Sequence, residues 1–244
     1  MKKHDLIGDN KRKKYIKTKE YPGHYCNVQQ MDLIGPRYLT GGFKYYIYTI
    51  MDIENHFAGV YPIQDKSAKS IAPSIVDFWS GYQMPDYLQM DNELSFRGSN
   101  RHPRGLGLLM RVAISNEVTP LFIPVAEPWR NGVIENFNNN VQKHFLSQPF
   151  TSLEDLQLKA KEFTAFHNEN HRYSSQNNKT PSELLSEIKC FSRLSKTIDL
   201  SERPCVDEGQ LIFIRFIRSD LTITILNSTF KVQEKLIYSY VEAI

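Results

Sequence analysis

The chain has 244 residues, of which 41% are hydrophobic and 12% aromatic, and its formal net charge is +3. This length allows one well-filled core and a small additional unit, and the composition is that of a soluble globular protein and argues against a disordered one. Its three cysteines are far apart with no CxxC pair, which argues against a zinc knuckle or a disulfide framework and favours a reducing, cytoplasmic setting. The longest strongly apolar run, YYIYTIM, is far too short for a membrane span, and the basic start is not followed by the apolar region of a secretory signal.

Positive charge is concentrated at the start of the chain. Residues 1–20 contain eight Lys or Arg and three acids, a net charge of +5, which leaves −2 on the remainder of a chain whose total is +3. A basic arm ahead of a mildly acidic body predicts contact with a polyanion. A solvated leader without a partner is the alternative.

The first half of the chain predicts strands, then a helix, then another strand. Residues 25–35 indicate a strand that ends at the turn pair Gly35-Pro36. Two runs of β-branched and aromatic residues, 43–52 and 56–63, flank the short turn IEN and predict a hairpin. Apolar residues at helical spacing predict a helix over 67–82. A short strand over 87–90 then stops at Asp91.

The second half alternates and then changes character. Helices are expected over about 106–114, 131–146 and 152–168, with a short strand over 119–125 before the second of them. A meander of three strands followed by alternating helices and strands predicts an α/β fold with a mixed sheet flanked by helices. From about Pro204 the chain reads as short alternating strands. We therefore expect a basic arm (1–24), a core (25–186), a linker (187–204) and a small all-β C-terminal module (205–244).

Three carboxylates stand out by their positions. Asp32 interrupts an apolar strand, where a charge is costly unless it is paired or bound to a metal. Asp91 ends a later strand, and Glu135 lies at the border of the apolar stripe of its helix. Carboxylates from two strands and a helix could hold two Mg²⁺ or Mn²⁺ ions, which prefer hard oxygen ligands and stabilise the oxygens of a phosphoryl transfer. Spacing alone is a weak signal in a chain with 27 acids.

A resemblance strengthens this interpretation. The segments MDLIGPRYLTGGFKYYIYTIMD, MDNELSF and PVAEPWRNGVIENFN together resemble the catalytic core of insertion-sequence transposases and retroviral integrases, and FHNENHRYSSQNNKTPSEL resembles the segment that follows this core in bacterial transposases. The resemblance implies a ribonuclease H-like fold with a mixed five-stranded sheet. It also implies a magnesium- or manganese-dependent Asp-Asp-Glu site with two ions, in which Asp32, Asp91 and Glu135 are the three acids.

The implied function is that of a bacterial DNA transposase or integrase, cytoplasmic and nucleoid-associated, which cleaves and joins DNA strands. Its partners would be element ends and target DNA, other copies of the chain on that DNA, and a separate helix-turn-helix region for end recognition. Departures from the family pattern, such as Glu93 where the family usually has Gly, keep two alternatives open. One is an inactive truncated transposase that binds DNA, and the other is a structure-specific nuclease of the same fold.

The expected DNA contacts come from three parts of the chain. Arginines without an intervening acid follow Asp91, and they suit phosphate contacts. The polar side of the helix that carries Glu135 and the basic arm are the other two parts. The residues are Arg97, Arg101, Arg104, Asn131, Asn138, Asn139, Gln142, Lys11, Arg12, Lys13 and Lys14.

Other polar residues compete for a functional role. Asp52 lies at the hairpin turn and is expected to form the turn, and Glu93 is expected at the surface. His167 and His171 have the spacing of a helical zinc pair, but Asn168 stands where that motif needs Glu. Ser67 is expected to begin a helix.

Overall fold

The computed structural model describes residues 20–99, 101, 103–188, 192, 194 and 198–244. Its strands are β1 (Val28–Tyr38), β2 (Lys44–Asp52), β3 (Ala58–Ile63), β4 (Tyr87–Met90), β5 (Thr119–Phe122), β6 (Ile212–Phe216), β7 (Thr222–Ile225), β8 (Ser228–Lys231) and β9 (Tyr240–Ala243). Its α-helices are α1 (Ala68–Gly81), α2 (Leu94–Arg97), α3 (Leu108–Ile114), α4 (Gly132–Asn140), α5 (Leu153–Asn170) and α6 (Pro181–Glu187). A 3-10 turn, η1 (Pro128–Asn131), leads into α4, and a π-helical turn, η2 (Val141–Phe145), continues it. No helix in this part of the chain is both long and apolar enough to cross a membrane.

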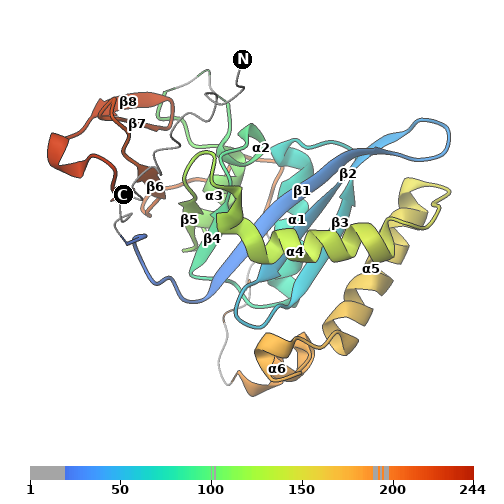
Figure 1. Cartoon of the computed structure of the whole chain (residues 1–244). Coiled ribbons are helices and arrows are strands. Elements are labelled where there is room, and N and C mark those ends of the chain that lie inside the picture. Colours follow the sequence, from blue (N-terminus) through green and yellow to red (C-terminus); the bar gives the residue numbers. More distant parts are fainter. Residues whose placement is uncertain (1–19, 100, 102, 189–191, 193, 195–197) are drawn as a thin grey trace, which may run out of the picture.

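The main sheet is mixed, in the order β3-β2-β1-β4-β5-β6-β9. The first three strands form an antiparallel meander, and β1, β4, β5 and β6 are parallel to one another. Strand β9 pairs antiparallel with β6. Helix α1 lies behind the sheet in Figure 1 and α4 crosses in front of it, so the sheet is the middle of three layers.

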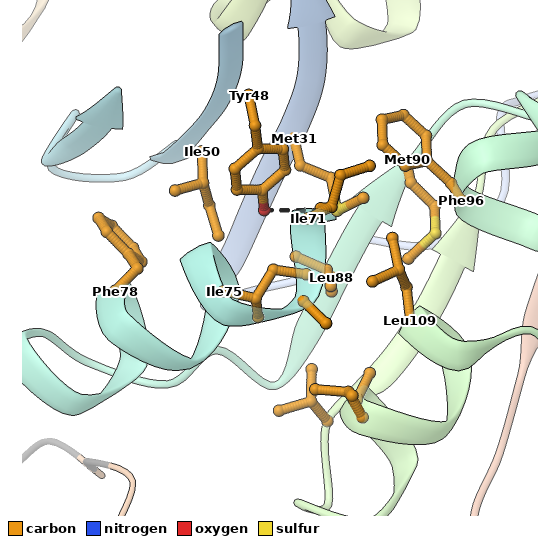
Figure 2. Close-up of a cluster of buried hydrophobic side chains, with 14 of the residues drawn as sticks. Met31, Tyr48, Ile50, Ile71, Ile75, Phe78, Leu88, Met90, Phe96 and Leu109 are labelled. Atoms are coloured by element: carbon orange, nitrogen blue, oxygen red, sulfur yellow. Dashed lines mark hydrogen bonds between the residues drawn. The ribbon is translucent and has the colours of Figure 1, made fainter. Parts of the chain in front are cut away.

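Alternation along the strands builds a separate core on each face of the sheet. Tyr48 and Ile50 of β2 face α1 and α3, whereas Ile47 and Met51 face α4 and α5. Figure 2 shows the first of these cores, where the Tyr48 hydroxyl donates a hydrogen bond to Met31 Sδ at 3.8 Å. Because both faces are covered, β2 reads as a continuous apolar run without polar alternation.

Strand β1 differs from its expected end. The sequence predicts a turn at Gly35-Pro36, but the strand continues to Tyr38, and its register against β2 shifts between Ile34 and Arg37. A β-bulge at this point accommodates a proline, which has no N–H for the ladder. The expected turn is therefore wrong, and the expected hairpin of β2 and β3 is confirmed.

The C-terminal strands extend the main sheet. The expected α/β fold with a β-rich C-terminal module is present, but β6 and β9 of that module enlarge the expected five-stranded sheet to seven strands. Only β7 and β8 form a sheet of their own, a hairpin at the upper left of Figure 1. The described residues of the expected linker also contact the core, because Leu194, Ile198 and Leu200 pack against the cluster around α1. The division of the chain into domains stays a prediction.

Helix α5 covers the free edge of the sheet. Asn168 is buried, and its side-chain amide pairs with one residue of the edge strand β3: Oδ1 accepts from Ala58 N and Nδ2 donates to Ala58 O, both at 2.9 Å. The side chain therefore acts as one more peptide unit of the sheet. Covering an edge in this way removes backbone groups that could pair with another chain.

We predict that Asn168→Ala destabilises the protein by about 1–3 kcal/mol, because two buried backbone groups lose their partners. Asn170→Ala is the control, since that side chain is exposed and bonds only to Phe166 O of its own helix. Urea unfolding measures both. Equal unfolding midpoints for the two variants would show that the Asn168 pairing contributes nothing.

Candidate active site

Asp32 lies inside β1, where Asn138 of α4 contacts it. One carboxylate oxygen accepts from the backbone N–H of Leu33 at 2.7 Å, and the other accepts from Asn138 Nδ2 at 2.8 Å. Burial raises the pKa of Asp32 to about 6, and the negative charges of Asp91 and Glu135 add to the rise against the lowering effect of those two hydrogen bonds. Asp32 is therefore close enough to both other acids to respond to their charges.

Asp91 is brought beside Asp32 by the register of two parallel strands. Val28 pairs with Tyr87 and Gln30 with Gln89, so the same register continued by two residues aligns Asp32 with Asp91. Asp91 ends β4 because its carboxylate accepts from Glu93 N at 2.8 Å and turns the chain. Burial raises the pKa of Asp91, the Glu93 charge raises it further, and the Glu93 N–H and the Lys66 charge lower it.

Glu135 comes from the first turn of α4. It precedes Asn138 by three residues, so both side chains lie on the helix face that meets β1. Glu135 is partly exposed, whereas Asn138 is buried. A carboxylate in the first turn is also stabilised by the positive end of the helix dipole. The fold thus brings three acids that are distant in sequence toward the C-terminal end of β4, which lies level with Asp32 in the middle of β1.

Buried amides fix α4 on the sheet. Gln30 Oε1 accepts from Ile134 N at 3.1 Å, and Asn131 Nδ2 donates to Met31 O at 3.3 Å. Asn138 Oδ1 accepts from the Thr49 hydroxyl at 2.8 Å, which links the helix to β2 as well. Asn131 and Asn138 were expected on an open, DNA-facing surface, and this is wrong because both are buried and bonded within the protein.

The remaining expected DNA contacts are more exposed. Asn139 is exposed, and Gln142 is exposed and accepts from Arg37 Nη2 at 2.8 Å. Arg101 and Arg104 are exposed on the loop before α3. The remaining arginine of the set is partly buried: Arg97 Nη1 donates to Asn227 Oδ1 at 3.0 Å. Lys11, Arg12, Lys13 and Lys14 lie outside the described residues.

Arg215 is a residue of this region that the sequence analysis missed. It is 7% exposed, and its guanidinium donates to Asn92 Oδ1 at 2.9 Å and to the carbonyl oxygens of Ile123, Ile214 and Thr224. Burial, and next the nearby Arg97 charge, lower its pKa to about 10. Arg215 therefore ties β6 to the residue after Asp91. The only available signal was an arginine inside the apolar run LIFIRFI.

The competing residues have structural roles in the described chain. Asp52 is buried and forms the hairpin turn, since its carboxylate accepts from the N–H groups of Glu54 and Asn55. Ser67 caps α1. Glu93 forms an ion pair with Lys66 at 2.5 Å. His167 is buried with its pKa lowered to about 3, mainly by burial and next by the His171 charge, as expected of a packed histidine.

The acids fit a divalent cation by their chemistry. All three offer carboxylate oxygens, which Mg²⁺ and Mn²⁺ prefer, and two of them are destabilised as anions by burial. Within the described residues, however, no three acidic, histidine or cysteine side chains are already close enough to form a metal site. The arrangement is therefore an open acidic cluster whose members share one end of the sheet.

Comparisons with known proteins agree with this architecture. Residues 116–181, which include Glu135 but neither aspartate, match the family described as integrase core domain. No curated protein matches the chain. A chain from the structure of the simian T-cell lymphotropic virus intasome in complex with PP2A regulatory subunit B56 gamma is 13% identical with a TM-score of 0.55, over 73% of this chain and 63% of that one. This chain therefore spans less than two thirds of that relative.

Two integrase catalytic cores are also similar. That of HTLV-2, solved with magnesium in a trimeric form, is 16% identical over 67% of this chain and 99% of its own, with a TM-score of 0.48. That of BIV is 15% identical over 66% of this chain and 94% of its own, with a TM-score of 0.49. The likeness to the intasome chain, at 13% identity and a TM-score of 0.55, shows the fold alone. The expected resemblance thus has two findings beside it, a match to the integrase core domain model over residues 116–181 and a fold shared with the intasome chain.

Proposed function

We propose that the protein is a DNA transposase or integrase that cleaves and joins DNA strands with Asp32, Asp91 and Glu135 as its catalytic acids. One observation carries this proposal. The parallel register of β1 and β4 and the bond from Asn138 to Asp32 gather carboxylates from three distant parts of the chain, and the Asp32 pKa responds to the other two charges. Burial disfavours the charged forms of Asp32 and Asp91, and a bound cation would offset that cost.

The residues around the acids orient them. Asn138 and the Leu33 N–H each occupy one lone pair of Asp32, and the Glu93 N–H does the same at Asp91, so the free lone pairs of both carboxylates remain for a metal ion. Glu135 would complete the site from the helix. Bound Mg²⁺ or Mn²⁺, two per site, would stabilise the attacking and leaving oxygens of an in-line displacement at phosphorus. Water would release a 3′-hydroxyl at an element end, and that hydroxyl would attack the target phosphate without a covalent enzyme intermediate.

DNA would be held by charges around this cluster. Arg101 and Arg104 are exposed after Asp91, and Asn139 and Gln142 are exposed on α4 and its continuation. The basic arm supplies a further cationic segment by composition. Contacts of this kind bind phosphate without reading sequence. Joining two DNA ends needs more than one protomer, so we propose that copies of the chain assemble on DNA.

An inactive DNA-binding remnant is the second candidate. The observation in its favour is that, among the described residues, no three acidic, histidine or cysteine side chains are close enough together to form a metal site. The two functions differ in chemistry and share DNA binding, so strand transfer separates them.

Glu135→Gln should lower strand transfer by about 10³-fold, since several kcal/mol of transition-state stabilisation is lost and each 1.4 kcal/mol is tenfold. The assay is Mn²⁺-dependent joining of a pre-cut DNA end, with Asp32→Asn and Asp91→Asn in parallel. DNA binding should persist. Glu162→Gln on the exposed side of α5 is the matched control. Joining at the wild-type rate by Glu135→Gln would remove this residue from the site, and no joining by the wild type would favour the remnant.

Divalent metal should raise the melting temperature of the wild-type protein, because it binds only the folded cluster. At a concentration 100 times the dissociation constant, the stabilisation is about 2.7 kcal/mol, or about 5–10 °C for a chain of this size. Asp32→Asn should lose most of this shift, and Glu162→Gln should keep it. A shift of the same size in Asp32→Asn would place the metal elsewhere.

Asp32→Asn should also change how stability depends on pH without metal. The folded pKa of Asp32 is about 6 and its ordinary value is 3.8, so folding is favoured while the group is protonated and loses stability as pH rises from about 4 to about 6. The loss is on the order of 3 kcal/mol. Asn does not ionise, so the variant should become more stable than the wild type above pH 6. Parallel stability curves between pH 4 and 7 would contradict a buried, ionisable Asp32.

A further inference from the structure

Arg130 lies immediately before α4, within a cluster of aromatic and acidic side chains. Its Nε bonds Glu127 Oε2 at 3.1 Å, and its Nη2 donates to the Tyr240 hydroxyl at 3.2 Å. The Tyr240 hydroxyl in turn donates to the Glu127 carboxylate, whose two oxygens lie 2.9 and 3.0 Å away. Glu127, Arg130 and Tyr240 thus form a closed hydrogen-bonded ring, which we call the arginine clamp.

Two further aromatic residues, Tyr21 and Phe216, pack against the clamp. The guanidinium carbon of Arg130 lies 3.7 Å from the ring centroid of Tyr21, and Tyr21 meets Tyr240 edge to face at 5.2 Å. Tyr240 also packs on Phe216 of β6 at 4.9 Å. The Arg130–Glu127 pair is largely buried, with 27% and 11% of the two side chains exposed. A planar cation over an aromatic face that donates to two different partners from Nε and Nη2 is a geometry that lysine cannot reproduce in full.

The clamp joins segments that are distant in sequence. Tyr21 precedes the first strand, and Tyr240 is the first residue of β9, the last strand of the sheet. Glu127 and Arg130 belong to the loop and the turn η1 that connect β5 to α4. The two ends of the described chain therefore meet on the segment that leads directly to Glu135.

Arg130 is also held by its backbone from the sheet side. Its carbonyl oxygen accepts from Gln89 Nε2 at 2.9 Å and from Gln30 Nε2 at 3.3 Å. These two glutamines belong to β4 and β1, the strands that carry Asp91 and Asp32. The backbone of Arg130 is thus held by the sheet, and its guanidinium is held by the clamp.

The start of α4 has no cap from its own N-cap residue and is held by contacts from outside the helix, among them the bond from Ile134 N to Gln30 Oε1. Asn131 makes no side-chain capping bond to the helix, and Gly132, its first residue, has open space where a Cβ would lie. The second half of α4 is secured by Phe137, which is buried in the core, and by Asn138. In the first turn, which holds Glu135, Ile134 is buried and bonded to Gln30, and the preceding segment with Arg130 sets how the chain enters that turn.

We propose that Arg130, through Glu127, Tyr240 and Tyr21, is a positioning residue that fixes the first turn of α4 and so places Glu135 against Asp32 and Asp91. Only the activity measurement that tests this inference rests on the proposed function; the measurement of helix protection does not. It assigns the C-terminal strand β9 a part in the active site, although none of its residues carries the chemistry. A displacement of about 1 Å at a catalytic group can lower the rate by about 10²-fold.

The test compares Arg130→Gln, Arg130→Lys and Tyr240→Phe with the wild type. Arg172→Gln is the control, because Arg172 is likewise paired with a glutamate, Glu183 at 2.9 and 3.0 Å, but joins α6 to the end of α5. Tyr240→Phe removes one hydroxyl and keeps the ring, so it remains informative if Arg130→Gln fails to fold. Glu135→Gln is included as a variant that changes the acid without changing its placement.

The first readout is amide hydrogen exchange over residues 131–138, which needs no activity. Loss of protection there in Arg130→Gln and Tyr240→Phe, with Arg172→Gln unchanged, is the expected result. Unchanged exchange in both clamp variants overturns the proposal whether or not the protein joins DNA. Failure of the proposed function would instead appear as a wild-type protein that joins no DNA while its clamp variants still lose protection.

The second readout is the kinetics of Mn²⁺-dependent joining of a pre-cut end. We expect kcat to fall by about 10²-fold in Arg130→Gln, with KM for DNA unchanged and a partial recovery of kcat in Arg130→Lys. Glu135→Gln should lose joining without losing α4 protection. A rise in KM at constant kcat in Arg130→Gln would show a direct DNA contact and overturn the positioning role.

Discussion

The hydrogen bond from Asn138 to Asp32 is the interaction on which the candidate site depends. A carboxylate inside an apolar strand is costly to bury, and this bond is one of the two that orient it. Asn138 is itself held by the Thr49 hydroxyl of the neighbouring strand. The chain Thr49–Asn138–Asp32 therefore restrains the rotation of α4 about its axis, and Glu135 lies one helical turn before Asn138 on the same helix.

The parallel pairing of β1 and β4 supplies the other half of the geometry. Parallel strands share their carboxyl ends, so a functional group on one strand meets the group at the same level on the next. Asp32 and Asp91 meet in this way, and Asn92, the residue after Asp91, is fixed by Arg215. Arg215 thereby fixes the residue that follows the second acid without forming an ion pair with that acid.

The sequence allowed much of this fold to be predicted, because apolar alternation and helical spacing are local signals. They located the β2–β3 hairpin, α1 and the long α5, and an acid interrupting an apolar strand marked Asp32. The inward role of Asn131 and Asn138 was not predictable in the same way. Polar residues at the border of the apolar stripe of a helix give the same sequence pattern whether they face solvent or buried strand carbonyls. Only the tertiary packing decides between the two positions.

Long-range pairing explains the remaining differences. Nothing local in the run LIFIRF indicates that it pairs with β5, nearly a hundred residues earlier, so the C-terminal strands read as a unit of their own. In the folded chain β6 contacts Asn92 through Arg215, and β9 contacts Arg130 through Tyr240. The C-terminal strands thus contact both the loop after Asp91 and the turn before the helix that carries Glu135. The relative placement of Asp91 and Glu135 is therefore coupled to strands that the local sequence pattern separates from the core.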